Sequence, residues 1–206
     1  MFNKENQVKK FLLEWYSVNA RSLPWRKKYK NNLPNPYFVF ISEYMLQQTT
    51  VNTVKNKFQD FIYKWPNINK LSQISEPQIL KFWSGLGYYS RARNLLKSAK
   101  IIKKKFKNKI PSSYDDLIML PGIGDYTAKA ILGIALNKSV MPLDANIERI
   151  LVRLHAVDEP IIKVKNKLKD LANKFISDKY SSNLIQSFMD YGSEICLPRN
   201  PKCNIC

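Results

Sequence analysis

Most apolar residues of this chain recur three or four positions apart, which is the spacing of an amphipathic α-helix. The pattern predicts helices within residues 8–15, 37–54, 95–106, 128–135 and 151–175. Prolines and glycines fall between these segments, and no alternating pattern typical of a strand persists. The sequence therefore predicts an all-α protein with short loops.

Composition narrows the class of protein. With 206 residues, 45% of them hydrophobic, the chain can form a core and either one large domain or two small ones. No apolar stretch of about 18 residues occurs, so we expect no membrane span. The polar start Met1–Asn6 lacks the apolar core of a secretory signal, so we expect a cytoplasmic protein without disulfides.

The formal net charge of +18 indicates a polyanionic partner, most simply a nucleic acid. A simpler interpretation exists, because 27 lysines against 7 arginines is the skew that an AT-rich genome produces. Charge by itself leaves both interpretations open.

One segment, Leu120–Ala128, lies between two predicted helices and carries two glycines at a turn. The pattern is typical of a helix–hairpin–helix motif, in which the first turn of the second helix offers backbone N–H groups to a phosphate. We therefore expect Gly122, Gly124 and Thr127 to contact a DNA backbone without reading its bases. The alternative is an ordinary hairpin of two helices.

All three cysteines of the chain, Cys196, Cys203 and Cys206, fall within its last eleven residues. Cysteines scattered by chance rarely cluster in this way, so we expect them to share a role. Three ordinary buried thiols are the alternative.

Six segments, taken in order, resemble the sequence blocks of the endonuclease III superfamily, and above all those of the adenine DNA glycosylases of the MutY type. They are Leu23–Arg26, Ile41–Thr49, Gly85–Asn94, Leu120–Ala128, Pro142–Arg149 and Cys196–Cys206. The resemblance covers nearly the whole chain. It implies a six-helix barrel domain with the helix–hairpin–helix at residues 26–136. It also implies a second helical domain, made of residues 1–25 and 137–206, that ends in an iron–sulfur loop.

The activity implied by the resemblance is base-excision repair of DNA. The enzyme would hydrolyse the N-glycosidic bond of adenine mispaired with 8-oxoguanine or guanine. Glu43 would protonate the departing adenine, and Asp144 would stabilise the positive charge at the sugar. Asn146 and Tyr126 would orient Asp144. Taken alone, Glu43 has the alternative of an acid on the solvated side of a helix, and Asp144 is most simply a helix N-cap.

Tyr126 decides the type of reaction. Bifunctional relatives carry a lysine at this place, and its amine forms a Schiff base with the sugar. Tyrosine has no such amine. The resemblance therefore implies a monofunctional DNA N-glycosylase that leaves an abasic site.

Other side chains match positions that contact the substrate in the family. The positions that line the adenine pocket are those of Trp25, Arg26 and Gln186. Leu46 lies in the catalytic glutamate block. The positions that wedge into the duplex are those of Gln48 and Tyr88. Packing alone is the alternative role for each. The implied partner is double-stranded DNA with a mismatched adenine, bound by a monomeric protein in the nucleoid.

In the family, four cysteines hold a [4Fe–4S] cluster. Cys196, Cys203 and Cys206 match the first three, and the sequence ends on the third. We therefore expect a truncated protein with three of the four ligands. A rigid cluster loop would place Arg199 and Lys202 against DNA phosphates.

Two other functions stay open. A thymine DNA glycosylase acting on G·T mismatches, from the same superfamily, shares the hairpin, the tyrosine and a segment like Asp144–Asn146. A DNA-binding remnant without activity would follow from the incomplete cysteine set.

Overall fold

The computed structural model describes residues 4–206, so the first three residues of the polar start lie outside the described residues. The chain divides into two compact units. Unit 2 is Ser22–Leu136, and unit 1 combines Asn137–Cys206 with the described part of Met1–Arg21. Between residues 4 and 206, extended pairing is limited to an isolated bridge between Lys28 and Pro34. The predicted all-α class is therefore confirmed.

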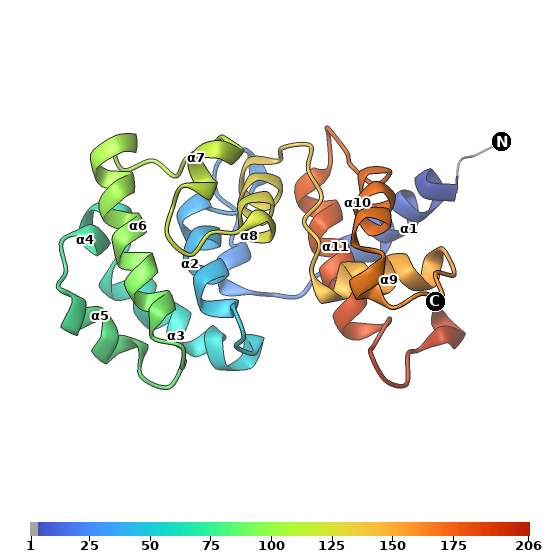
Figure 1. The fold of residues 1–206 in the computed structure, drawn as a ribbon, viewed down its shortest axis with the longest axis horizontal. Helices are drawn as coiled ribbons and strands as arrows, with labels where there is room; N and C mark the ends of the chain where they lie inside the picture. Colours follow the sequence, from blue (N-terminus) through green and yellow to red (C-terminus); the bar gives the residue numbers. More distant parts are fainter. Residues whose placement is uncertain (1–3) are drawn as a thin grey trace. The chain divides into compact units, whose positions relative to one another are not determined.

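Unit 2 is a succession of helices joined by short connections (Figure 1). Its elements are η1 (Pro24–Arg26), η2 (Lys30–Asn32), α2 (Pro36–Leu46), α3 (Val51–Lys64), α4 (Ile68–Ser72), α5 (Glu76–Trp83), α6 (Ser90–Phe106), α7 (Tyr114–Ile118), α8 (Asp125–Ala130) and the π-helical η3 (Ile131–Ala135).

The helix α2 forms the core of unit 2. Its sequence is apolar on every face, and it packs against α3, α6 and η3. A helix of this kind is buried all round. Asn35 begins the helix, because its side chain accepts a hydrogen bond from the Tyr37 amide, and Pro36 follows at the first helical position. Glu43 is therefore an acid within a core helix.

The apolar segment 37–54 is not one helix. Gln48 has a φ of +55°, which ends α2 in a left-handed turn. The Thr50 side chain then accepts a hydrogen bond from the Thr53 amide and starts α3. Apolar spacing alone does not reveal this break, because both helices bury residues of the same kind.

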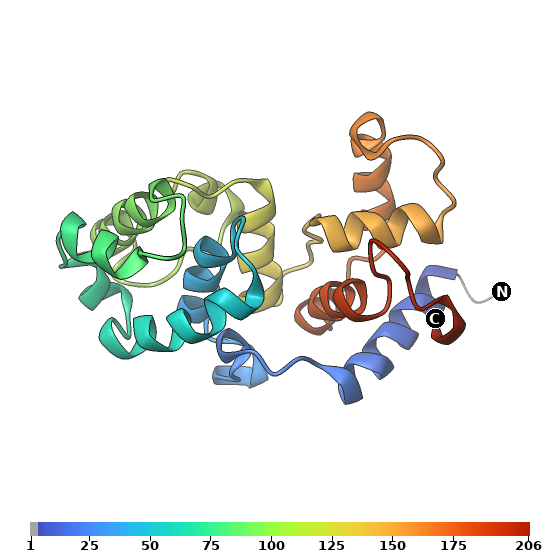
Figure 2. The same ribbon diagram turned by 90° about the horizontal axis from the view of Figure 1, so that it is seen from below.

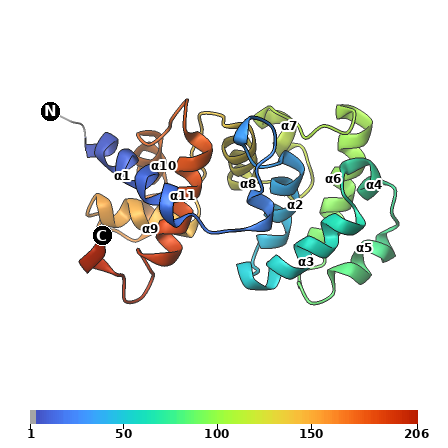
Figure 3. The same cartoon turned by 180° about the vertical axis from the view of Figure 1, so that it is seen from behind.

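Unit 1 contains α1 (Lys4–Asn19), α9 (Ala145–Leu154), η4 (Ile161–Lys163), α10 (Lys165–Asn173), α11 (Ser181–Glu194) and η5 (Cys203–Ile205). The largely buried helix α11 lies between α1 and α9 (Figure 2). In the reverse view α1 runs along α11 (Figure 3).

An internal ion pair joins the first and last parts of unit 1. Asp190 of α11 is fully buried and accepts a hydrogen bond from Arg21 Nε at 2.6 Å and another from the Arg21 backbone amide at 3.0 Å. A buried carboxylate needs such partners. The pair therefore anchors the residues after α1 on α11.

None of the helices described for residues 4–206 has the length and apolar character needed to cross a membrane.

Candidate active site and cysteine loop

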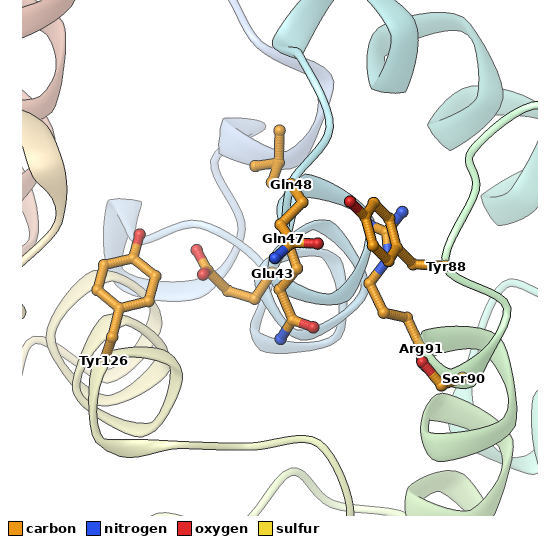
Figure 4. A pocket seen from close by; sticks show the side chains of 8 residues that line it. Glu43, Gln47, Gln48, Tyr88, Ser90, Arg91 and Tyr126 are labelled. Atoms are coloured by element: carbon orange, nitrogen blue, oxygen red, sulfur yellow. The ribbon is translucent and has the colours of Figure 1, made fainter.

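Unit 2 contains a cavity of about 470 Å³, called here the glutamate cavity. Figure 4 shows the side chains that line it: Glu43, Leu46, Gln47, Gln48, Tyr88, Ser90, Arg91 and Tyr126. They come from the carboxyl end of α2, from the loop before α6 with the start of α6, and from α8. Residues as far apart in the sequence as Glu43 and Tyr126, 83 positions, thus line one cavity.

Glu43 is the buried acid of this cavity. It is 7% exposed, so it does not lie on a solvated helix side. Its carboxylate and the hydroxyl of half-buried Tyr126 point toward each other across the cavity (Figure 4). An acid held out of bulk water, with a polar side chain opposite, is the environment in which general acids occur.

The nearest lysine on α8 is engaged elsewhere. Lys129 lies one turn after Tyr126, and its Nζ is 3.0 Å from Asp125 Oδ1 and 3.1 Å from Asp125 Oδ2. Tyr114 also donates a hydrogen bond to Asp125 Oδ1 at 2.8 Å. This arrangement favours Tyr126 as the residue of α8 that faces the glutamate cavity.

Gln48 and Tyr88 line the glutamate cavity from two loops, and both have left-handed backbones, with φ values of +55° and +46°. Non-glycine residues adopt this conformation only where surrounding contacts hold it. Tyr88 is 62% exposed, which suits a side chain that contacts a partner.

Arg91 holds these two loops together, a role that no sequence pattern reveals. Its guanidinium is buried and donates to the carbonyls of Met45 at 2.8 Å and Leu86 at 2.7 Å. Further bonds reach Tyr44 O, Gly87 O and Thr49 Oγ1. A rigid fork with five donors suits such a junction. Burial lowers the pKa of Arg91 from its ordinary value.

The hairpin turn is tied into unit 2 through its carbonyl groups. The Tyr44 hydroxyl donates to Pro121 O at 2.5 Å, and Gln47 Nε2 donates to Gly122 O at 3.2 Å. Gly122 has a φ of +82°, and a Cβ there would lie 3.0 Å from Asn94 and 3.1 Å from Tyr44. Only glycine meets both conditions.

The two other expected phosphate-contact residues lie at the start of α8. Gly124 is the residue before the helix, and Thr127, in its first turn, is 4% exposed. The first amides of any α-helix lack acceptors within the helix.

Trp25 and Arg26 occupy η1 of unit 2, away from the lining of the glutamate cavity as the described residues define it. Trp25 is 6% exposed and packs edge-on against Phe58 of α3, with ring centroids 5.4 Å apart. Its contacts in unit 2 are therefore those of a core side chain.

In unit 1, Asp144 is the N-cap of α9. Its Oδ1 accepts a hydrogen bond from the Ile147 amide at 2.7 Å, and its Oδ2 accepts one from Asn146 Nδ2 at 3.0 Å. Asp144 is thus an N-cap in the local structure, as the alternative held. One carboxylate oxygen makes the cap, and the other accepts a hydrogen bond from Asn146. The predicted pairing of Asn146 with Asp144 exists; the predicted contribution of Tyr126, which lies in unit 2, stays a prediction.

Arg149 connects this segment to the cysteine loop. Its Nη2 donates to Asn146 Oδ1 at 2.8 Å and to Gly192 O at 2.5 Å, and its Nε donates to Cys196 O at 2.6 Å. The guanidinium fixes the side-chain amide that holds Asp144. The residue is five positions after Asp144, and no sequence signal marks the contact with a loop 47 positions away.

Glu148 adds a second acid near Asp144. Burial raises its pKa above the ordinary value; the nearby Lys165 opposes the shift, and the Asp144 charge adds to it. The carboxylates at the start of α9 therefore repel each other.

Gln186 lies in α11 and is 3% exposed. Its Nε2 donates to Ser182 O at 3.0 Å and to Ser182 Oγ at 3.1 Å. Its Oε1 is buried and has no hydrogen-bond partner among residues 4–206. A buried acceptor of this kind is normally satisfied by an ordered water or by another bound group.

The three cysteines line one cavity of about 550 Å³ in unit 1, called here the cysteine cavity. Its other walls are largely apolar side chains of α1, α9 and α11. Arg153 donates hydrogen bonds to Cys196 Sγ at 3.2 Å and to Leu197 O at 2.7 Å. A guanidinium at this distance stabilises negative charge on the sulfur.

The lining of this cavity offers three thiols as ligands for a metal group. Within residues 4–206, no three or more His, Cys, Asp or Glu side chains converge as ligands of one ion would. A four-iron cube carries one thiolate on each iron, so its ligands surround a volume. Three thiols around one apolar cavity, with Arg153 and Lys202 also lining it, fit such a group.

Arg199 and Lys202 are both exposed, in the loop between Cys196 and Cys203. The Lys202 amide donates to Ile195 O at 3.0 Å, which closes the loop on the end of α11. Arg199 and Lys202 therefore lie in a loop whose backbone is hydrogen-bonded at its start, at Cys196 O, and near its end, at the Lys202 amide.

The helical fold, the hairpin and the buried acid before it define a class of DNA repair proteins. Residues 41–174 match the model of the HhH-GPD superfamily of base excision DNA repair proteins. The chain belongs to this superfamily, as its sequence blocks predicted.

Individual relatives narrow the comparison. The chain is 44% identical to the adenine DNA glycosylase of Buchnera aphidicola subsp. Schizaphis graminum over 198 residues, which are 95% of this chain and 56% of that protein. It is 35% identical to the human adenine DNA glycosylase over 201 residues, covering 95% of this chain and 37% of that one. The chain thus spans about half the length, or less, of these curated relatives.

Solved structures agree on the fold. A thermostable thymine-DNA glycosylase matches with a TM-score of 0.87 at 25% identity, covering 98% of this chain and 92% of that one. An endonuclease III–DNA complex matches with a TM-score of 0.77 at 20% identity, covering 100% and 93%. The predicted endonuclease III type of fold is confirmed.

Proposed function

We propose that this chain is the catalytic part of a monofunctional adenine DNA glycosylase. It would bind double-stranded DNA as a monomer and remove adenine paired with 8-oxoguanine or guanine. The observation that carries the proposal is the glutamate cavity, which holds a buried Glu43 opposite Tyr126. The 44% identity to a curated adenine DNA glycosylase supports the choice of base.

The proposed reaction is hydrolysis of the bond between C1′ of the sugar and N9 of adenine. Glu43 would give its proton to the departing base, water would add its oxygen to C1′, and the proton released from that water would return to the Glu43 carboxylate. Asp144, oriented by Asn146, would stabilise the positive charge that develops at the sugar. Because Tyr126 has no amine for a Schiff base, the product would be an abasic site in an uncut strand.

The proposed DNA contacts are of two kinds. Gly122, Gly124 and Thr127 of the hairpin, with Arg199 and Lys202 of the cysteine loop, would hold phosphates. Gln48 and Tyr88 would enter the base stack beside the extruded adenine. Leu46 and Gln186 would contact the base, with Gln186 Oε1 as an available acceptor. Trp25 and Arg26, both in η1, would also line the pocket for the adenine, as the resemblance to the family implies.

We further propose that Cys196, Cys203 and Cys206 hold a [4Fe–4S] cluster in the cysteine cavity. When bound, this group would cross-link the loop that carries Arg199 and Lys202, and its contribution would be structural. The chain's own residues would orient it through Arg153 at Cys196 Sγ and Arg149 at Cys196 O.

The test is single-turnover excision on four duplexes that carry A·8-oxoG, A·G, T·G or A·T. We expect adenine release from the first two, and strand breaks only after alkali or heat. Glu43→Gln and Asp144→Asn should each lower the rate by about 10²-fold or more with little change in DNA affinity. Asp60→Asn and Glu159→Gln remove exposed carboxylates and serve as controls.

A second candidate is a thymine glycosylase acting on T·G, favoured by the structural match to a thymine-DNA glycosylase. Faster release of thymine than of adenine would select it. Duplex binding without release of either base would instead identify a DNA-binding protein without this activity. Near-normal rates in the Glu43 or Asp144 variant would remove that residue from the mechanism.

A further inference from the structure

The hydroxyl of Tyr191 is a buried donor without a partner. The residue is 4% exposed, and within residues 4–206 its Oη makes no hydrogen bond. A buried phenolic O–H normally finds an acceptor, because leaving it unpaired costs its full desolvation energy. An orphan of this kind points to an acceptor supplied by a bound group.

The place of this hydroxyl is the cysteine cavity. Tyr191 lines that cavity together with all three cysteines. Its pKa is raised above the ordinary value, first by burial and then by its interaction with the Cys206 side chain, which lies near the hydroxyl.

The ring of Tyr191 is held by two aromatic side chains of α1. It packs edge-on against Phe11, with centroids 5.7 Å apart, and against Trp15, with centroids 5.1 Å apart. Its backbone carbonyl accepts hydrogen bonds from the amides of Ile195 and Cys196, both at 2.9 Å. Tyr191 therefore combines a fixed ring with a direct backbone link to the first cysteine.

We propose that Tyr191 donates an O–H···S hydrogen bond to a thiolate of the metal-bound cysteine set. Thiolate sulfur carries the negative charge that makes it an acceptor, and hydrogen bonds to ligand sulfurs tune iron–sulfur groups. The inference rests on the proposed [4Fe–4S] cluster and adds to it a positioning residue on α11.

If this hydrogen bond exists, Tyr191→Phe should change the unfolding temperature in opposite directions in the metal-free and the iron-loaded protein. In the metal-free chain, Tyr191→Phe removes a buried orphan and should raise the unfolding temperature. In the iron-loaded chain, the same change removes a bond to sulfur and should lower it. A tyrosine that acts only through ring packing would give equal shifts in both states, because phenylalanine keeps the ring.

The experiment compares the 206-residue chain with its Tyr191→Phe variant, each metal-free and each reconstituted anaerobically with ferrous iron and sulfide. Bound iron and sulfide, the unfolding temperature and the loss of cluster absorbance in air are measured. We expect equal initial iron loading, and absorbance loss in the variant faster by roughly 2- to 10-fold. Tyr63→Phe, at a side chain 92% exposed, is the matched control.

Two negative results are distinguishable. Absence of bound iron and sulfide in the unmutated chain would overturn the proposed cluster, and its hydrogen bond with it. Iron-loaded proteins with equal air stability, and equal unfolding shifts in both states, would overturn the role of Tyr191 and leave the cluster standing.

Discussion

Replacing Gly192 with alanine tests the contact that holds Asn146 against Asp144. Gly192 of α11 faces α9 so closely that a Cβ would lie 2.6 Å from Asn146 Cβ and 3.2 Å from Asn146 Cα. Carbon atoms in ordinary contact are about 3.5–4.0 Å apart, so the two helices would have to separate by about 1 Å. The methyl group therefore pushes on the residue that donates to Asp144 Oδ2.

The expected magnitude follows from the cost of overpacking. Forcing an extra methyl group into a close-packed helix interface costs about 1–3 kcal/mol of unfolding free energy. For a unit of this size, each kcal/mol corresponds to a change of about 4–8 °C in the unfolding temperature. Displacement of the Asn146 amide should also lower single-turnover excision by roughly tenfold, which corresponds to about 1.4 kcal/mol in the activation barrier.

The assay is a double-mutant cycle of thermal unfolding and single-turnover excision. Asn146→Gly removes the Cβ that clashes, so Gly192→Ala should cost less unfolding free energy in that background than in the unmutated chain. DNA affinity should change little in the single variant, because the proposed phosphate contacts lie elsewhere. A Gly192→Ala protein with unchanged unfolding temperature and unchanged excision rate would refute the reasoning.

Three further predictions concern other parts of the chain. Arg91→Met should lower the unfolding free energy by about 2 kcal/mol or more, because buried carbonyls of α2 and of the loop before α6 lose their donor; an unchanged urea midpoint would contradict this. Tyr126→Lys should make a borohydride-trapped adduct with mismatched DNA detectable on denaturing gels, whereas the unmutated chain should give none. His155 is the chain's only histidine, and burial first, then Lys4 and Lys174, lower its pKa. The unfolded chain therefore binds a proton at His155 more readily, so the free energy of unfolding should fall as the pH drops through about 6.5. His155→Gln should lose less unfolding free energy than the unmutated chain between about pH 7.5 and 5.5. Parallel profiles of unfolding free energy against pH would exclude this role.

Local signals in the sequence predicted much of the protein. Apolar spacing predicted the helices, and the Pro121–Gly124 turn predicted the hairpin, because both depend on contacts between near neighbours. The order of the sequence blocks predicted the superfamily. Asp144 could be marked as a helix N-cap from its position alone.

The surroundings of each site residue depend on contacts with residues that are far away in the sequence. The sequence left Glu43 open between a solvated and a buried acid, and packing of α3, α6 and η3 around α2 buried it. The same spacing that predicted helix within 37–54 did not reveal the turn at Gln48. The residues on either side of it, Met45 and Thr49, are bound by Arg91, which lies 46 and 42 positions later in the sequence.

Tertiary structure alone decided the junctions in unit 1. Arg149 reaches Asn146 within its own helix, which spacing allows, but its bond to Cys196 requires α9 and α11 to pack closely. Gly192 makes that approach possible because it has no Cβ. Tyr191 lines one cavity with the cysteines because the loop after α11 folds back on Ile195. Residue type and spacing determined which helices form. The packing of those helices determined which side chains are buried and which distant donors and acceptors form hydrogen bonds.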